Sequence, residues 1–301
     1  DPERGPHRQC ASRKLSPRFP DNIDEIPHTF KCHIALSCTR RIRTIIALMA
    51  ATITFINHAT LLVQIDGVNI LTDPIYSRTV SFMFPRRQKP GIPFEDLPPI
   101  NYILVSHSDY DHLNLKTLRM LRRKGPSAIV IPRGLVLYAR KSGFEDIVEL
   151  NTWEPAERPD MKITCTPAKH HSKRTAWDRT GSACCGFVLQ SKNHTVYFAG
   201  DTGYAEFFHE LGSRFSIDAA LLPIGAYKPE AWFKNLHLHP AAAVKAFLDL
   251  KARHLIPYHW GTFWISDEPM AEPPKLLLAE SERFQIRDKI HILNNGESVK
   301  F

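Results

Sequence analysis

Four apolar, strand-like runs along this chain are each followed closely by histidine or aspartate. The runs and the residues that follow them are 102–105 with His107–His112, 161–165 with His170, 196–199 with Asp201, and 255–258 with His259. Strand ends are rigid platforms, and the loops that follow them can direct several side chains into one cleft. The pattern predicts an α/β fold with a polar cluster at one edge of its sheets.

Hydrophobic periodicity predicts the order of the remaining elements. Hairpin-like strands come first, and Asp66-Gly67 is a strong two-residue turn between two of them. Strands and helices then alternate through two halves of the chain. Strands are expected at 52–56, 60–65, 68–71, 102–105, 128–131, 161–165, 185–190, 195–199, 219–222 and 254–258, and helices at 114–124, 134–142, 204–214, 240–251 and 274–284. This order favours two packed sheets with helices outside, in one domain over residues 50–301.

Positive charge is concentrated near the start of the chain. The formal net charge is +8, and residues 1–45 are rich in proline, arginine and serine with little periodicity. We interpret this segment as a basic N-terminal arm. A basic arm suits an anionic substrate or an anionic membrane face, and it is equally consistent with a solvated tail.

Cysteine usage and hydropathy favour a cytoplasmic protein. The six cysteines form no CxxC pair, so reduced thiols are expected rather than a disulfide scaffold. No run approaches the roughly 18–20 apolar residues needed to span a bilayer. The apolar run 44–51 superficially resembles a signal peptide, but it lies far from the start of the sequence and continues into a strand.

The segment His107–His112 carries the strongest chemical signal. His107, Asp109, Asp111 and His112 bring imidazole and carboxylate groups together within six residues. These are the usual ligands of Zn²⁺, Mn²⁺ or Fe²⁺ in open catalytic sites. One loop supplies more ligands here than a single cation easily takes, which favours two cations. A polar surface loop is the alternative for this segment taken alone.

The order His-x-Asp-x-Asp-His, His170, Asp201, His259 resembles the metallo-β-lactamase superfamily. More narrowly, the chain is similar to the branch that contains N-acyl-phosphatidylethanolamine-hydrolysing phospholipase D and ascorbate-6-phosphate lactonase. The similarity covers about residues 50–285 and rests on six further segments: Thr54–Thr60, Leu71–Tyr76, Lys169–Thr175, Phe198–Tyr204, Pro223–Tyr227 and His259–Phe263. The resemblance implies the four-layer αββα metallo-β-lactamase fold and a metal-dependent hydrolase.

The resemblance also implies a set of metal ligands. One cation would be held by His107, Asp109 and His170, and the other by Asp111, His112 and His259, with Asp201 bridging them. His170 is preferred to His171 from its place in the motif. The expected cations are two divalent ions, Zn²⁺ first. They would share a water whose pKa is lowered, which supplies a hydroxide nucleophile. They would also stabilise charge developing on a phosphoryl or carbonyl oxygen.

Asp109 departs from the family pattern, which usually has histidine at this position. Carboxylate is a legitimate ligand, and a related branch of di-iron proteins has an acidic residue there. The carboxylate hardens the site and shifts the choice of cation towards Mn²⁺ or Fe²⁺. It also leaves open a weakened or vacant first site, and with it a centre with one metal or a catalytically impaired metal-binding scaffold.

Further residues are expected beside the centre. Asp111 and His237 are the candidate catalytic residues, and His237 could transfer a proton or bind phosphate unless it only precedes a helix. The candidate substrate-binding residues are His58, Arg174, Tyr204 and His237. Arg174 suits bidentate phosphate binding, with an exposed basic residue as the alternative. Asp73 is expected to support the metal loop through hydrogen bonds.

The leading hypothesis is a phosphodiesterase of phospholipase D type that acts on N-acyl-phosphatidylethanolamine-like lipids. The basic arm and a proline-rich loop over 74–99, which carries Arg86 and Arg87, would give peripheral contact with an anionic membrane. A lactonase or other carboxylic-ester hydrolase is the second hypothesis. No nucleic acid partner is expected, because a charge of +8 alone is weak evidence for one. The oligomeric state does not follow from the sequence.

Overall fold

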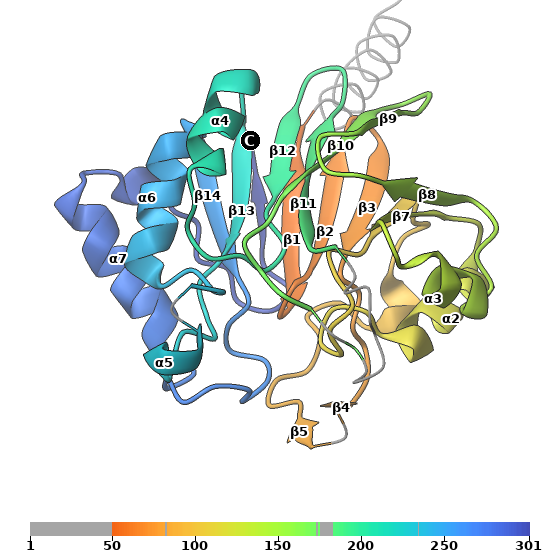
Figure 1. Cartoon of the computed structure of the whole chain (residues 1–301), viewed down its shortest axis with the longest axis horizontal. Helices are drawn as coiled ribbons and strands as arrows, with labels where there is room; N and C mark the ends of the chain where they lie inside the picture. Colours follow the sequence, from red (N-terminus) through yellow and green to blue (C-terminus); the bar gives the residue numbers. More distant parts are fainter. Residues whose placement is uncertain (1–49, 82, 173, 175–182, 234) are drawn as a thin grey trace, which may run out of the picture. The chain divides into compact units, whose positions relative to one another are not determined.

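The computed structural model describes residues 50–301 apart from 82, 173, 175–182 and 234, and apart from the side chain of Trp232. The basic arm predicted over residues 1–45 and the cysteines Cys10, Cys32 and Cys38 lie outside the described residues. Within them, two large β-sheets pack against each other, and helices cover the outer face of each sheet (Figure 1).

The first sheet has the strand order β15-β1-β2-β3-β6-β7-β8. Its strands are β1 (Thr52–Asn57), β2 (Thr60–Ile65), β3 (Val68–Thr72), β6 (Tyr102–Leu104), β7 (Ala128–Pro132), β8 (Ile147–Leu150) and β15 (Ser298–Lys300). β2 and β3 form the predicted hairpin. Asp66 (φ 48°) and Gly67 (φ 82°) both lie in the left-handed region that this two-residue turn requires. From β3 to β8 the strands run parallel.

The second sheet has the strand order β14-β13-β12-β11-β10-β9. Its strands are β9 (Pro155–Glu157), β10 (Lys162–Pro167), β11 (Cys185–Gln190), β12 (Thr195–Phe198), β13 (Ala219–Pro223) and β14 (His254–Tyr258). β12, β13 and β14 are parallel. The loops after β12 and β14 therefore leave the same edge of this sheet, and these loops carry Asp201 and His259.

Side chains alternate between the two faces of each strand. They form one hydrophobic core between the two sheets and one further core between each sheet and its helices. In β12, Val196 and Phe198 face the first sheet, whereas Tyr197 faces the helices. In β2, Leu61 and Val63 face the second sheet, and Leu62 faces the helices on the other side. Both sheets are thus buried on both faces, which is why their strands are almost continuously apolar.

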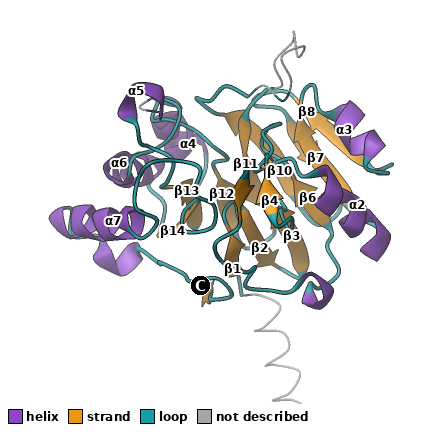
Figure 2. Cartoon of the chain, turned by 90° about the horizontal axis from the view of Figure 1, so that it is seen from below, coloured by secondary structure: helices purple, strands orange, loops and turns teal. Residues whose placement is uncertain are grey.

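The helices form two separate outer layers, which flank the sheets in Figure 2. The helices are α2 (Leu115–Lys124), α3 (Val136–Lys141), α4 (Phe207–Arg214), α5 (Glu230–Phe233), α6 (Pro240–Leu250) and α7 (Glu272–Arg283), with two short 3₁₀ turns at Phe94–Asp96 and Arg287–Lys289. α2 and α3 bury Leu118, Leu121 and Ala139 against the first sheet. α4, α6 and α7 cover the second sheet. The structure therefore confirms the expected αββα layers.

Several elements differ from the sequence prediction. β8, β9 and β15 were not predicted. β9 and β15 contain only exposed or half-exposed residues, and β8 is a four-residue strand in which only Leu150 is buried. The expected loop 74–99 contains a short hairpin of β4 (Thr79–Val80) and β5 (Phe84–Pro85). The helix predicted from residue 204 begins at Phe207.

The described helices include none that is both long and apolar enough to cross a membrane.

Candidate metal centre

The loop after β6 is anchored by a buried aspartate at the end of β3. Asp73 accepts hydrogen bonds from the backbone N–H of Ser106 (2.7 Å) and from its hydroxyl (2.6 Å). It also accepts from Nδ1 of His112 at 2.7 Å. All three residues are fully buried. With Nδ1 bound to a carboxylate, His112 presents its Nε2 lone pair to the centre, so Asp73 has the supporting role that the sequence predicted.

One group of donor atoms comes from His107, Asp109 and His170. Nε2 of His107 and Nε2 of His170 each lie 3.4 Å from Oδ2 of Asp109. Their other ring nitrogens are engaged. Nδ1 of His170 donates to the carbonyl of Leu236 (3.1 Å), and Nδ1 of His107 lies 2.8 Å from the Ser106 hydroxyl. Both imidazoles therefore direct Nε2 to the same point. The neighbouring His171 is exposed, which agrees with the preference for His170.

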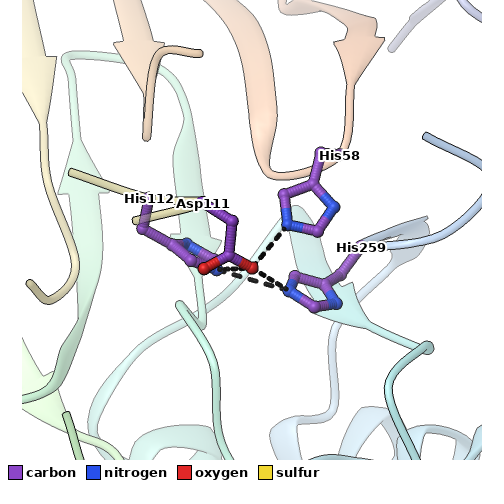
Figure 3. A group of neighbouring side chains, drawn as sticks. All are labelled: His58, Asp111, His112 and His259. Carbon is purple, nitrogen blue, oxygen red and sulfur yellow. Dashed lines mark hydrogen bonds and ion pairs between the residues drawn. The ribbon is translucent and has the colours of Figure 1, made fainter. Parts of the chain in front are cut away.

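A second group contains Asp111, His112 and His259. Oδ2 of Asp201 lies 3.1 Å from Nε2 of His112 and 3.0 Å from Nε2 of His259. Oδ2 of Asp111 is 3.6 and 3.7 Å from the same two nitrogens. Figure 3 shows the imidazoles of His58, His112 and His259 around Asp111, with His58 and His259 beside each other. Nε2 of His58 is 3.0 Å from Oδ2 of Asp111.

The backbone around the centre is locally strained. Asp201 follows Gly200 at φ 63°, and a Cβ at that glycine would lie 2.5 Å from the Cys185 carbonyl oxygen. Only glycine fits this approach. His58 (φ 45°) and His259 (φ 65°) also have left-handed backbones, and their main chains are joined by a 2.9 Å hydrogen bond. Such conformations in residues other than glycine cluster at functional sites.

The donor geometry fits divalent cations. A tetrahedral ion with bonds of about 2.0–2.1 Å has ligand atoms about 3.3–3.4 Å apart, and the separations in both groups lie around this value. Nε2 of His107 and Oδ1 of Asp201 are buried and have no hydrogen-bond partner among the described residues. Buried polar atoms normally have a bonding partner, and a bound cation would supply one for both of these atoms. His107, His170 and Asp201 form one candidate metal-binding group, and His58, Asp111, His112 and His259 form another.

The charges of the clustered side chains also favour the binding of a cation. Burial opposes ionisation of Asp111 and Asp201, but the surrounding histidines still hold the pKa of both carboxyl groups well below its ordinary value. Burial likewise opposes the charging of His259, yet Asp201 and Asp111 raise its pKa to about 9. The clustered carboxylates therefore attract positive charge strongly, and protons and metal cations compete for the same lone pairs.

A cavity of about 190 Å³ opens onto both groups. Its polar part consists of Ser81, Asp109, Asp111, Asp201 and His237. Apolar residues from the β4–β5 hairpin and from two later segments complete the lining: Val80, Phe84, Ala226, Phe233 and Ile265. The cavity is smaller than the roughly 300–1,000 Å³ of typical ligand pockets, so it suits the reacting group of a substrate rather than a whole lipid.

The structure brings His237 and His58 to the centre. Nδ1 of His237 is 3.8 Å from Oδ2 of Asp201 and has no hydrogen-bond partner among the described residues. Burial, together with the neighbouring imidazoles of His259 and His170, lowers the pKa of His237 to about 3 against the opposing effect of Asp201. The imidazole of His237 is therefore neutral at physiological pH.

Arg174 and Tyr204 lie elsewhere. The guanidinium of Arg174 donates to the carbonyls of Ser108 and Leu113, both at 2.8 Å, and it stacks over Tyr110 at 4.3 Å. These hydrogen bonds stabilise the loop after β6, which carries His107–His112, and direct the guanidinium away from the cavity. Tyr204 stacks on Phe208 of α4 and donates its hydroxyl to Asp249 of α6. Neither side chain lines the cavity.

Sequence reasoning missed Ser172 and part of the cavity wall. The Ser172 hydroxyl donates to Oδ1 of Asp109 at 2.6 Å. Ser172 lies within the quoted segment Lys169–Thr175, but serine is too common in loops to suggest this role. Val80 and Phe84 were missed as well, because the loop 74–99 gave no sign of its internal hairpin, and Ile265 was missed because it lies in an irregular segment after β14.

Residues 68–260 match the family model of the Beta-lactamase superfamily domain. The chain belongs to the metallo-β-lactamase superfamily. The residues for which the resemblance implies a ligand role lie close together in this structure, and the fold is shared with solved structures. Igni18, a metallo hydrolase from the hyperthermophilic archaeon Ignicoccus hospitalis, superposes with a TM-score of 0.66 at 23% identity, over 84% of this chain and 98% of that one.

Two curated relatives are more similar in sequence. An uncharacterized protein of Mycobacterium bovis is 35% identical over 240 residues, which cover 76% of this chain and 64% of the relative. N-acyl-phosphatidylethanolamine-hydrolyzing phospholipase D 1 of Caenorhabditis elegans is 33% identical over 226 residues, which cover 70% and 64%. The matched region thus spans slightly less than two thirds of each relative. The superfamily is one of metal-dependent hydrolases, and the chain carries a His/Asp cluster able to bind the cations.

Proposed function

We propose that this protein is a metal-dependent phosphodiesterase of phospholipase D type that acts on N-acyl-phosphatidylethanolamine-like lipids. The observation that carries the proposal is one cavity bordered by both donor groups and by His237. The nematode relative, whose name states phospholipase D activity on such lipids, supports the choice of substrate. The proposed ligands are His107, Asp109 and His170 for one cation, Asp111, His112 and His259 for the other, and Asp201 between them.

Two divalent cations at these positions would lower the pKa of a bound water and polarise a phosphoryl oxygen. The protein's part is to place the phosphodiester. His237 is neutral, so it would bind a phosphoryl oxygen through an N–H hydrogen bond rather than through charge. Asp111, held by His58 at 3.0 Å, keeps its carboxylate oriented towards His112 and His259. The apolar part of the cavity wall would limit the access of bulk water.

The cavity is sized for the reacting headgroup, so the acyl chains would remain outside it. Residues 74–94 contain no acidic side chain and carry Arg78, Arg87 and Lys89 at the surface. Met83 in this segment is 74% exposed, and Trp264, stacked under Arg87, is 57% exposed. Exposed apolar tips flanked by cations suit peripheral contact with an anionic membrane, from which the lipid would enter.

The test is hydrolysis by the purified protein loaded with Zn²⁺ or Mn²⁺. Vesicles containing N-acyl-phosphatidylethanolamine should yield N-acylethanolamine and phosphatidic acid, measured by mass spectrometry. Chelation should abolish this release and added metal should restore it, and Asp201→Ala should remain inactive. Release that persists after complete metal removal would contradict the mechanism.

A lactonase or carboxylic-ester hydrolase is the alternative, and one observation favours it. The cavity lining includes three carboxylates but no lysine or arginine among the described residues. A neutral carbonyl substrate needs no such cation, whereas a phosphodiester would rely on the metals for charge. A panel of lactones, esters and phosphodiesters, assayed under Mn²⁺ and Zn²⁺, separates the two. Failure of the whole panel, with metal bound, would favour a non-catalytic metal-binding scaffold.

A further inference from the structure

Outer hydrogen bonds support three of the four histidines in the proposed set of metal ligands. Nδ1 of His112 donates to the carboxylate of Asp73 at 2.7 Å. The second ring nitrogens of His107 and His170 lie 2.8 Å from a hydroxyl and 3.1 Å from a backbone carbonyl, respectively. Metal-binding histidines almost always use their second ring nitrogen in this way, because the bond fixes the tautomer and the orientation of the ring.

His259 is the exception among these four histidines. Its Nε2 faces Asp201 at 3.0 Å and Asp111 at 3.7 Å. Figure 3 shows its other ring nitrogen, Nδ1, on the side away from Asp111. Nδ1 is buried and has no hydrogen-bond partner among the described residues. An imidazole that binds a cation through Nε2 carries its proton on Nδ1, so this buried N–H needs an acceptor.

A small cavity of about 20 Å³ is lined by His58, His259, Trp260, Ser266 and Glu268, together with mainly apolar residues. A single water needs about 10–15 Å³ of such space, so the small cavity has room for one water. Nε1 of Trp260 is a second buried N–H without a partner among the described residues. Two N–H groups that need an acceptor therefore belong to residues around one water-sized cavity.

Glu268 supplies the one carboxylate among the described residues that line the small cavity, and it is 5% exposed. Its Oε1 accepts from the backbone N–H of Ala226 at 2.6 Å and from the Ser266 hydroxyl at 2.7 Å. Its Oε2 accepts from the backbone N–H of Lys228 at 3.2 Å. A carboxylate has about four acceptor positions, so one position on Oε2 remains for a further donor.

We propose that one ordered water in the small cavity accepts from Nδ1 of His259 and from Nε1 of Trp260 and donates to Oε2 of Glu268. Glu268 is thereby a positioning residue, which acts on the metal through His259 and touches neither the cation nor the substrate. The water-linked carboxylate keeps the tautomer that presents the Nε2 lone pair to the centre, as Asp73 does directly for His112. The proposal rests on the metal centre of the proposed function and not on the identity of its substrate.

Chelator competition on the whole chain tests this role. Wild type, Glu268→Gln and Asp267→Asn are stripped of metal, and the affinities of both sites for Zn²⁺ and Mn²⁺ are measured. Asp267→Asn is the matched control, because it makes the same carboxylate-to-amide change on an exposed neighbour outside the cavity lining. Glu268→Gln should weaken one site about tenfold and leave the other unchanged, and the control should match the wild type.

Two further measurements separate this positioning role from mere support of the surrounding loop. In ¹⁵N NMR of the Zn²⁺-loaded protein, His259 should be the Nδ1–H tautomer, and its proton should exchange with solvent faster in Glu268→Gln than in the wild type. A crystal structure of the metal-loaded wild type should place one water within hydrogen-bond distance of His259, Trp260 and Glu268. A merely structural role would lower thermal stability and leave both results unchanged.

Equal metal affinities in the wild type and Glu268→Gln, or an equal loss in Asp267→Asn, would overturn the proposal. So would a metal-loaded crystal structure in which Nδ1 of His259 is bonded to a protein group. If Glu268→Gln does not fold, the position of the water in the wild-type crystal decides it. A protein that behaves as described but leaves the lipid intact would refute the phospholipase assignment alone.

Discussion

Nδ1 of His112 donates to the buried carboxylate of Asp73 at 2.7 Å, and this bond fixes which ring nitrogen faces the centre. Ser106 and His112 occupy both carboxylate oxygens of Asp73, so we expect its effect on a bound metal to pass through the orientation of His112.

Asp73→Asn should therefore weaken one cation site with little change in the rest of the fold. An amide is a poorer acceptor than a carboxylate and lets the ring of His112 change tautomer, so the affinity should fall about 10- to 100-fold. Chelator competition measures it. Asp160→Asn is the control, because it removes a carboxylate that accepts from Tyr102 on the surface. Equal affinities in all three proteins would show that Asp73 has only a structural role.

His237 should matter for turnover and not for metal content. Removing one preorganised donor from a charge-stabilising site costs about a hundredfold or more in rate. His237→Ala should lose this much in kcat and still bind metal fully by elemental analysis. His237→Gln keeps an N–H donor and should recover part of the rate. A His237→Ala protein with reduced metal content would instead make His237 a ligand.

Membrane contact should depend on Met83 and Trp264. Replacing both with serine removes the exposed apolar tips near the cavity, so binding to anionic vesicles and hydrolysis of vesicle lipid should both decrease. Activity on a short-chain soluble phosphodiester should not change. Leu137→Ser with Phe284→Ser is the matched control, since these side chains are 58% and 50% exposed on helix α3 and just after α7. An equal loss in the control would indicate general destabilisation.

Metal uptake should release protons in a defined pH window. Asp201 and Asp111 overcome the effect of burial and raise the pKa of His259 from 6.5 to about 9 in the metal-free chain. This stabilising contribution is complete below pH 6.5 and is lost as the pH rises through about 9. Thermal unfolding of metal-free protein should therefore shift to lower temperature across that range.

Calorimetric titration with Zn²⁺ in buffers of different ionisation enthalpy measures the same protons directly. Proton release should be clear at pH 7 and decrease above pH 9. Release that does not depend on pH would show that His259 is already neutral before the metal binds.

Much of the architecture could be read from the sequence because buried strands carry a strong apolar signal. Val196–Phe198 and Leu255–Tyr258 were placed within a residue or two. β9 and β15 were not, because edge strands with exposed side chains resemble loops. The pairing of β15 also depends on a partner far along the chain, as in Thr54 with Ser298.

For the site, the positions of histidine and aspartate just after predicted strands, together with the family resemblance, identified the residues that lie close together. They could not supply the surroundings of each side chain. Arg174 was expected to meet substrate, but it is engaged by two carbonyls of the loop after β6, a contact that only the folded chain creates. Ser172 went unnoticed for the same reason, because its role depends on the hydrogen bond that its hydroxyl donates to Asp109 in the folded chain.

The main-chain hydrogen bond between His58 and His259 joins the first hairpin to a strand two hundred residues later. Each metal group likewise takes ligands from both sheets. During synthesis on the ribosome, the aspartates of the early loop emerge long before the histidines that complete them. With the proposed ligands, the second cation would therefore bind only after residue 259 has left the exit tunnel, and it would then hold the two sheets of the domain together.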